Sequence, residues 1–213
     1  MTLTTVIDGL TMYLGLLVLL TFHEYGHAWM ALQCGDDTAK QQGRCSLNPL
    51  VHIDPIGTVF LPLLMIFMPG AGRFLIGWAR PVPVNPHNLR QPQRDDILIS
   101  LAGPVMNLIL AVVLMGLARL AWMVGAESVM KLCSETAYLS LLLCFFNLLP
   151  IPPLDGSHVL RNLTRMSYET YYSIARYGFI IIIVVLQFPP VRALLSGVTV
   201  GTWEMIGGWF GLT

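Results

Sequence analysis

Five residues near the start of the chain, His23-Glu24-Tyr25-Gly26-His27, have residue types and a spacing that suit metal-assisted hydrolysis. Side chains four residues apart lie on one face of a helix, so His23 and His27 can bind one Zn²⁺ through their imidazole nitrogens. Glu24 then lies beside the metal without binding it, where it can take a proton from zinc-bound water. The pattern therefore indicates hydrolysis of a peptide bond.

The segment that carries this motif, Leu10 to Leu32, is apolar and about long enough to cross the hydrocarbon core of a membrane as a helix. An ionisable residue at the centre of such a helix costs roughly 2.5 to 3.5 kcal/mol on insertion scales, and the motif contains three of them. Metal binding is the simplest compensation. We therefore expect a zinc site inside the membrane rather than a chance match in a soluble helix.

The composition of the whole chain agrees with a membrane protein. Of its 213 residues, 55% are hydrophobic and only 11% are charged, and the mean hydropathy is +0.67. The net charge is zero and the basic residues are scattered, which excludes a nucleic-acid-binding surface. The four cysteines form no CxxC pair, so we expect buried apolar side chains rather than a redox or structural metal site. They are Cys34, Cys45, Cys133 and Cys144.

A third protein ligand is expected because catalytic zinc usually has three plus a water molecule. Asp155 is the best candidate, since the prolines in Asn147 to Gly156 end a span and can present a carboxylate on irregular backbone. Such backbone is tolerated at membrane depth where it lines a protein cavity. His158 is the rival ligand, although it can equally begin a helix after a Ser157 cap.

Four further polar residues have less specific roles. Asn147 and Asn107 lie in apolar spans and need hydrogen-bond partners, so each could steady a substrate carbonyl or oxyanion, or could bond a neighbouring helix. His52 and Asp54 lie where a loop meets the membrane, and we interpret them as structural.

The expected fold is an all-α polytopic membrane protein with four to six transmembrane helices. After Leu10 to Leu32, the candidate spans are Ile97 to Val124, interrupted by Gly103-Pro104, then Thr136 to Leu149, Tyr171 to Phe188 and Val191 to Leu212. Ile56 to Met68 is too short for a span, contains Pro62 and is closed by Pro69-Gly70, which favours a re-entrant segment. Cys34 to Pro55 and Gly77 to Pro86 are expected to be loops with short extended or β segments.

The orientation follows from the basic residues of two loops. Half of the chain's Lys and Arg side chains lie in these loops, which the positive-inside rule assigns to the cytoplasm. They are Lys40, Arg44, Arg73, Arg80, Arg90 and Arg94. The motif-bearing half of the first helix is then expected to open toward the cytoplasm. No secretory signal peptide is expected, because the first twenty residues contain no Lys or Arg.

The motifs HEYGH and NLLPIPPLDG resemble those of the site-two protease family of intramembrane zinc metalloproteases. The runs GDDTAKQQGRCSLNPLVHIDPIGT, GWARPVPVNP and AGPVMN are similar to its compact prokaryotic branch, which lacks PDZ and CBS domains. The resemblance covers about residues 10–190 of a single domain, 1–213, and leaves 191–213 as an interfacial or transmembrane tail.

The resemblance implies one Zn²⁺ per chain, bound by His23, His27 and Asp155, with Glu24 as general base and acid and Asn147 near the scissile carbonyl. It also implies transmembrane protein or peptide substrates, and a location in a prokaryotic cell membrane with a site that water reaches from the cytoplasm. A homo-oligomer is compatible with the sequence.

Two other functions could use the same residues. A catalytically silent relative that binds membrane proteins is disfavoured by the intact Glu24. A metal transporter would need several polar positions along successive helices, and these spans have few. For the protease, the segments Arg44 to Asn48 and Ala79 to Val84 could hold an unwound substrate by strand addition, a hypothesis that rests on their composition.

Overall fold

The computed structural model describes residues 3–67 and 77–212, so the expectations for Met68, Pro69-Gly70 and Arg73 lie outside the described residues. Within these ranges the chain is helical and contains no β-strand. The helices are α1 (Leu3–Gln33), α2 (Thr38–Gln41), α3 (Leu61–Phe67), α4 (Pro92–Met123), α5 (Glu127–Asn147), α6 (Asp155–Thr164), α7 (Tyr168–Ala175), α8 (Gly178–Gln187) and α9 (Pro189–Trp209). Short turns of 3₁₀ or π-helix occur at Pro49–Val51, Pro55–Phe60 and Pro86–Asn88.

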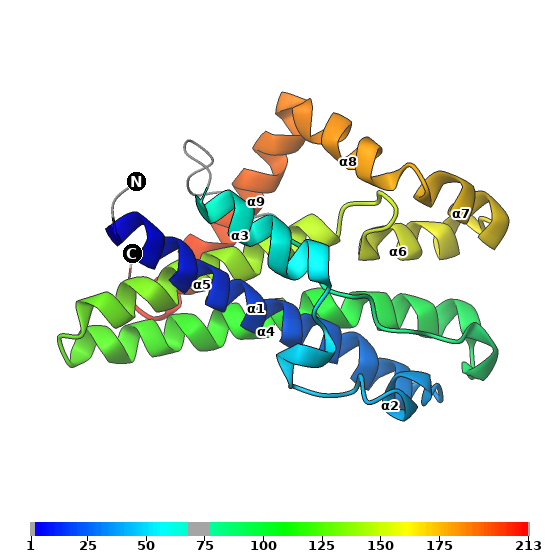
Figure 1. Cartoon of the computed structure of the whole chain (residues 1–213), viewed down its shortest axis with the longest axis horizontal. Helices are drawn as coiled ribbons and strands as arrows, with labels where there is room; N and C mark the ends of the chain where they lie inside the picture. The colour runs from blue at the N-terminus through cyan, green and yellow to red at the C-terminus, as the bar shows by residue number, and fades with distance from the viewer. Residues whose placement is uncertain (1–2, 68–76, 213) are drawn as a thin grey trace.

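Three long helices, α1, α4 and α5, lie side by side and form the body of the molecule (Figure 1). In the described part of the chain, these three are long and apolar enough to cross a membrane. A fourth candidate span is the pair α7 and α8, which is bent by 64°. The all-helical fold is thus confirmed, and by length and composition three or four candidate spans are found where four to six were expected.

All three helices begin earlier than their apolar stretches predicted: α1 at Leu3 rather than Leu10, α4 at Pro92 rather than Ile97, and α5 at Glu127 rather than Thr136. The added starts of α4 and α5, PQRDD and ESVMKLCSE, contain the charged residues that the apolar windows left out. The interruption expected at Gly103-Pro104 is wrong, because α4 continues through Pro104. A proline inside a membrane helix is tolerated where neighbouring groups surround the freed backbone carbonyl, and both residues of this pair are buried.

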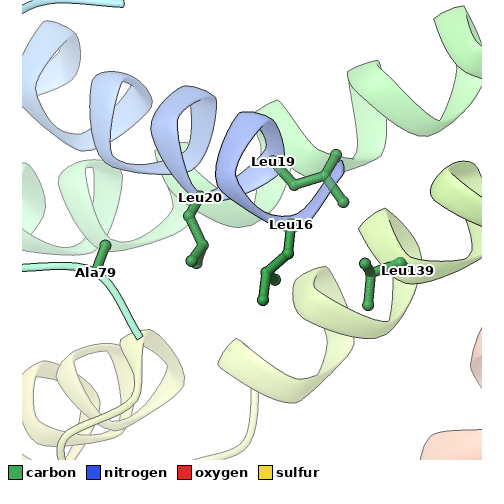
Figure 2. Close-up of a cluster of buried hydrophobic side chains, with 5 residues drawn as sticks. All are labelled: Leu16, Leu19, Leu20, Ala79 and Leu139. Carbon is green, nitrogen blue, oxygen red and sulfur yellow. The ribbon is translucent and has the colours of Figure 1, made fainter. Parts of the chain in front are cut away.

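Close packing holds the long helices together, since lipid is as apolar as their side chains. In one cluster, Leu16, Leu19 and Leu20 of α1 meet Leu139 of α5 and Ala79 of the extended segment (Figure 2). In a second cluster, α4, α5 and α9 meet through residues that include two fully buried alanines; its members are Ala111, Met115, Ala137, Leu141 and Ile206. The outer faces of the long helices carry exposed apolar side chains, as expected for a lipid-facing surface.

The expected short β segments and the re-entrant segment are not confirmed. Residues 77–85 are extended but form no strand ladder. They are attached to the preceding loop by two backbone hydrogen bonds, from Trp78 N–H to Gly57 (3.2 Å) and from Arg80 N–H to His52 (2.9 Å). The described part of the proposed re-entrant segment is helical up to Phe67.

The four cysteines are free, as expected. Cys34 and Cys144 are buried apolar side chains, whereas Cys45 and Cys133 are only half-buried.

Candidate metal centre

Two helices bring three side chains of types that can bind a metal to one point. His23 and His27 project from α1, and Asp155 is the first residue of α6. The Nε2 atoms of the two histidines lie 3.0 Å apart, and they lie 3.2 and 3.4 Å from the two carboxylate oxygens of Asp155. Among the described residues, 3–67 and 77–212, these three side chains form the one group of His, Cys, Asp or Glu that could hold a metal ion. Their ligand atoms all lie within 4.8 Å of one another.

The donor set fits zinc. Two imidazole nitrogens and a carboxylate oxygen are ordinary zinc ligands, and three protein ligands leave a fourth position for water. Asp155 Oδ2 is buried and accepts no hydrogen bond. Two imidazole nitrogens and a carboxylate facing one another at these distances are satisfied together by a cation placed between them.

The second ring nitrogen of each histidine, Nδ1, contacts a group on α4. The Nδ1 of His27 donates to the Ile99 carbonyl at 2.7 Å. The amide of Asn107, which is fully buried, faces the Nδ1 of His23 at 3.2 Å, and its Oδ1 has no partner. A metal-bound histidine usually donates its second N–H to such a group. With the Asn107 amide turned so that its oxygen faces Nδ1, both Nε2 atoms are free for a metal.

Of the two roles open for Asn107, a contact to the substrate or oxyanion and a bond to a neighbouring helix, the structure shows the second, since its amide faces His23 on α1. Asn147, given a similar role, lies at the end of α5 and donates to the Leu143 carbonyl of the same helix at 2.9 Å.

A glycine of α4 makes room for the two histidines. A Cβ on Gly103 would overlap the Nε2 of His27 and would lie 2.7 Å from the Cε1 of His23. Gly26 of the motif similarly lets α1 approach α4, since a Cβ there would lie 2.8 Å from the Ala102 carbonyl oxygen. The sequence reasoning missed Gly103; its only signal was a glycine inside an apolar span.

Glu24 is buried, and its Oε2 accepts a hydrogen bond of 3.1 Å from the backbone N–H of Val82. Val82 lies between Pro81 and Pro83, which have no N–H, so it supplies the only backbone donor of these three residues. The extended segment therefore orients Glu24 by a single backbone contact.

Arg44 fixes this extended segment from the other side. Its Nη2 donates to the carbonyls of Arg80 (2.5 Å) and Pro81 (3.3 Å). Burial and the nearby Arg80 lower the pKa of Arg44, while the negative charge of Glu24 partly opposes the shift. The buried guanidinium thus lies within electrostatic reach of Glu24.

The backbone before α6 directs Asp155 toward the histidines. The helix begins at Asp155, so the expectation that Ser157 caps it is wrong; Leu154 is the extended residue before the helix. The hydroxyl of Ser157 instead donates to the Leu154 carbonyl at 2.5 Å and contacts the Tyr171 hydroxyl at 3.0 Å. A Cβ on Gly156 would overlap the Leu148 carbonyl, so this tight turn requires glycine.

The other polar candidates lie outside the metal-binding group. The Nδ1 of His158 faces Asp96 of α4 at 3.4 Å. His52 donates from Nε2 to the Ser46 carbonyl at 2.8 Å, and Asp54 accepts from the N–H groups of Ile56 and Gly57 at 3.0 and 2.6 Å. His52 thus holds the loop at Ser46, and Asp54 caps the helical turn Pro55–Phe60.

Comparison with known proteins identifies the family. The sequence model of peptidase family M50 matches residues 11–128 and 121–186. The chain belongs to peptidase family M50. The resemblance to the site-two protease family and the expectation of a metalloprotease are thereby confirmed.

Bacterial relatives agree with this assignment. YwhC of Bacillus subtilis, which carries the name of a zinc metalloprotease, is 40% identical over 182 residues that cover 82% of this chain and 78% of YwhC. Rip2 of Mycolicibacterium smegmatis, named likewise, is 35% identical over 82% of this chain and 66% of its own length. Rip2 of Mycobacterium tuberculosis is 31% identical over 91% of this chain and 73% of its own length. Among solved structures, none matches the chain significantly.

Proposed function

We propose that this M50 peptidase is a zinc-dependent intramembrane endopeptidase that hydrolyses peptide bonds in or near the transmembrane segments of membrane proteins. The observation that carries the proposal is the convergence of His23, His27 and Asp155 on one point, with both histidines on α1, a helix that is long and apolar enough to span a bilayer. The relatives named as zinc metalloproteases support zinc as the metal.

Different residues bind the metal, transfer the proton and orient the imidazoles. His23, His27 and Asp155 hold the metal, which when bound supplies Lewis acidity and an activated water near neutral pH. Glu24 accepts the proton of the attacking water and passes it to the leaving amine. Asn107 and Ile99 keep the two imidazoles in the orientation in which Nε2 faces the metal. Asn147 remains the candidate for a contact near the scissile carbonyl.

A helical substrate must be unwound before cleavage, because its carbonyls are engaged in hydrogen bonds. The segment Ala79 to Val84 lies beside Glu24 and supports the hypothesis of strand addition. The N–H groups of Trp78, Arg80 and Val82 are bonded to the protein. Since alternate residues of an extended chain face opposite sides, Ala79, Pro81 and Pro83 form the other edge, on which the Pro81 carbonyl already accepts from Arg44. We expect that edge to act mainly as an acceptor of hydrogen bonds from the substrate, since two of its residues are prolines.

The cytoplasmic orientation of the site rests on the positive-inside rule. The basic loop residues that point to it include Lys40 and Arg94, which flank the ends of α1 and α4 nearest the metal-binding residues. A cysteine-accessibility experiment with a membrane-impermeant reagent on a Lys40→Cys variant tests this orientation. Labelling from the outside of intact cells that exceeds the labelling of the wild type, with its four native cysteines, would contradict it.

The transport alternative has little support. A conducting path needs several polar sites along successive spans, and the described residues hold a single group that could bind a metal.

The experiment that tests the enzymatic proposal compares the wild type with Glu24→Gln in detergent or proteoliposomes, using a candidate transmembrane substrate. The variant keeps the three ligands, so we expect full zinc content and no cleavage. Cleavage at the wild-type rate by Glu24→Gln would contradict the mechanism, and absence of zinc from the wild type would contradict the metal site.

A further inference from the structure

A second buried polar cluster joins α6 to α4 a short distance along the chain from the candidate metal ligand. Its centre is Asp96 of α4, which is 9% exposed. Asp96 Oδ2 accepts from Arg161 Nη2 at 2.8 Å and also from the amide of Asn162. Its Oδ1 lies 3.4 Å from His158 Nδ1. Three side chains of one short helix therefore converge on one carboxylate.

These partners share a face of α6 with Asp155. His158 and Asn162 follow Asp155 by three and seven residues, the spacing of side chains on one face of a helix, and Arg161, six residues on, lies at the edge of that face. The same face thus carries the candidate metal ligand at its first residue and the Asp96 partners along the rest.

The facing side of α4 has a matching order. Asp96, Ile99, Gly103 and Asn107 are separated by three, four and four residues, so they also lie along one helix face. Ile99 and Asn107 contact His27 and His23, and Gly103 leaves them space. One face of α4 therefore holds both histidines of α1 and, through Asp96, the helix that presents Asp155.

The position of α6 depends strongly on this polar contact. The helix has ten residues, a length that is marginal without tertiary contacts. Two of its apolar side chains, Leu160 and Leu163, are 38% and 72% exposed. In contrast, Arg161 is 3% exposed, and its guanidinium lies 3.9 Å from the centre of the Tyr168 ring. A buried ion pair contributes little net stability, but its fixed geometry can specify one arrangement of the helices that carry it.

We propose that Asp96 is a positioning residue for the metal centre: by accepting hydrogen bonds from Arg161 and Asn162 and facing His158, it sets the position of α6 at which Asp155 completes the ligand group. The inference rests on the proposed zinc site. Asp96 is far from the HEYGH motif in the sequence. The two aspartates then have different roles: Asp155 binds the metal, and Asp96 orients α6, the helix that carries Asp155.

The test measures metal binding without substrate. The variant Asp96→Asn removes the charge while keeping the size of the side chain. Asp95→Asn is the matched control, because Asp95 is equally buried and adjacent but accepts from the Gln91 N–H at 2.7 Å at the start of the same helix. Full-length proteins in detergent are titrated with zinc against a competing chelator, and the Co²⁺-substituted proteins are examined by visible absorption, which reports the ligand geometry.

We expect Asp96→Asn to bind zinc about 10- to 100-fold more weakly than the wild type, the usual cost of removing a group that orients a metal ligand. Its Co²⁺ spectrum should change in shape, because Asp155 no longer binds in the wild-type geometry. Asp95→Asn should match the wild type in both measurements. Wild-type zinc affinity in Asp96→Asn, or an equal loss in both variants, would overturn the proposal.

Should Asp96→Asn not fold, Asn162→Ala carries the test, since Asn162 is only partly buried and donates to the same carboxylate. We expect a several-fold loss of zinc affinity with retained helix content, and unchanged affinity would overturn the proposal. A wild type that binds no zinc would instead contradict the proposed function, so the two failures are distinguishable.

Discussion

The backbone N–H of Val82 donates a 3.1 Å hydrogen bond to the Oε2 of Glu24, joining an extended segment to the motif helix across 58 residues of sequence. Glu24 is the proposed general base, and an oriented carboxylate transfers a proton more efficiently than one that rotates freely. The segment between Trp78 and Asn85 is therefore part of the site and not only a covering loop.

Replacing Val82 by proline removes this donor while the extended backbone is retained. A hydrogen bond to a charged group contributes roughly 1.5 to 3 kcal/mol, so we expect kcat for a membrane substrate to fall about 10- to 100-fold. Zinc content should not change, because no ligand is altered. The matched control is Val84→Pro, which changes the same segment two residues away from the Glu24 contact. An equal loss in both variants would show that the N–H of Val82 has no special role.

Arg44 is expected to act on the same base indirectly. Arg44→Met removes the hydrogen bonds to the Arg80 and Pro81 carbonyls and should lower kcat with little effect on zinc content. Arg44→Lys keeps a charge and one donor, so it should recover part of the rate. The measurement is a comparison of kcat and zinc content for both variants. Wild-type kcat in Arg44→Met would contradict a role for Arg44 in holding the segment.

Gly103→Ala should disrupt the metal centre, because the added methyl would overlap the Nε2 of His27. We expect a large loss of zinc binding, measured by metal analysis of the purified protein. Gly116→Ala in the same helix is the control, since its Cβ would lie 3.4 Å from the Phe210 ring, an ordinary contact. That variant should keep its zinc and gain roughly 0.5 to 1 kcal/mol of helix stability. Normal zinc binding by Gly103→Ala would contradict the described approach of α4 to α1.

The pH dependence of stability should show the contribution of Asp36, which lies in the loop after α1. Burial opposes its ionisation, but hydrogen bonds from Thr38, Asn85 and Asn88 outweigh this effect and lower its pKa below the ordinary 3.8. A pKa that is lower in the folded state stabilises the protein above the unfolded-state pKa, and this contribution is lost as the pH falls through the folded pKa.

The wild type should therefore lose more thermal stability than Asp36→Asn as the pH is lowered from about 5 to about 3. Thermal unfolding in detergent, followed by circular dichroism, measures this difference. Parallel pH profiles for the two proteins would show that the carboxylate of Asp36 does not contribute in this way.

The features that the sequence predicted are those encoded within a short stretch. The spacing of His23 and His27, the apolar length of the spans and the prolines before Asp155 each depend on nearby residues. The spacing of residues along the sequence cannot show contacts between distant segments. One such contact joins His27 to Ile99, 72 residues away. Backbone groups such as the Val82 N–H carry no residue-specific signal, and Gly103 and Asp96 become meaningful only once α4 is placed against α1 and α6.

The measurement that tests the central claim most directly is zinc analysis combined with X-ray absorption at the zinc edge on the purified wild type and Asp155→Ala. We expect one zinc ion per wild-type chain, bound by two imidazoles and a carboxylate oxygen, and weakened or lost binding in the variant. A wild type without zinc, or an unchanged zinc environment in Asp155→Ala, would contradict it.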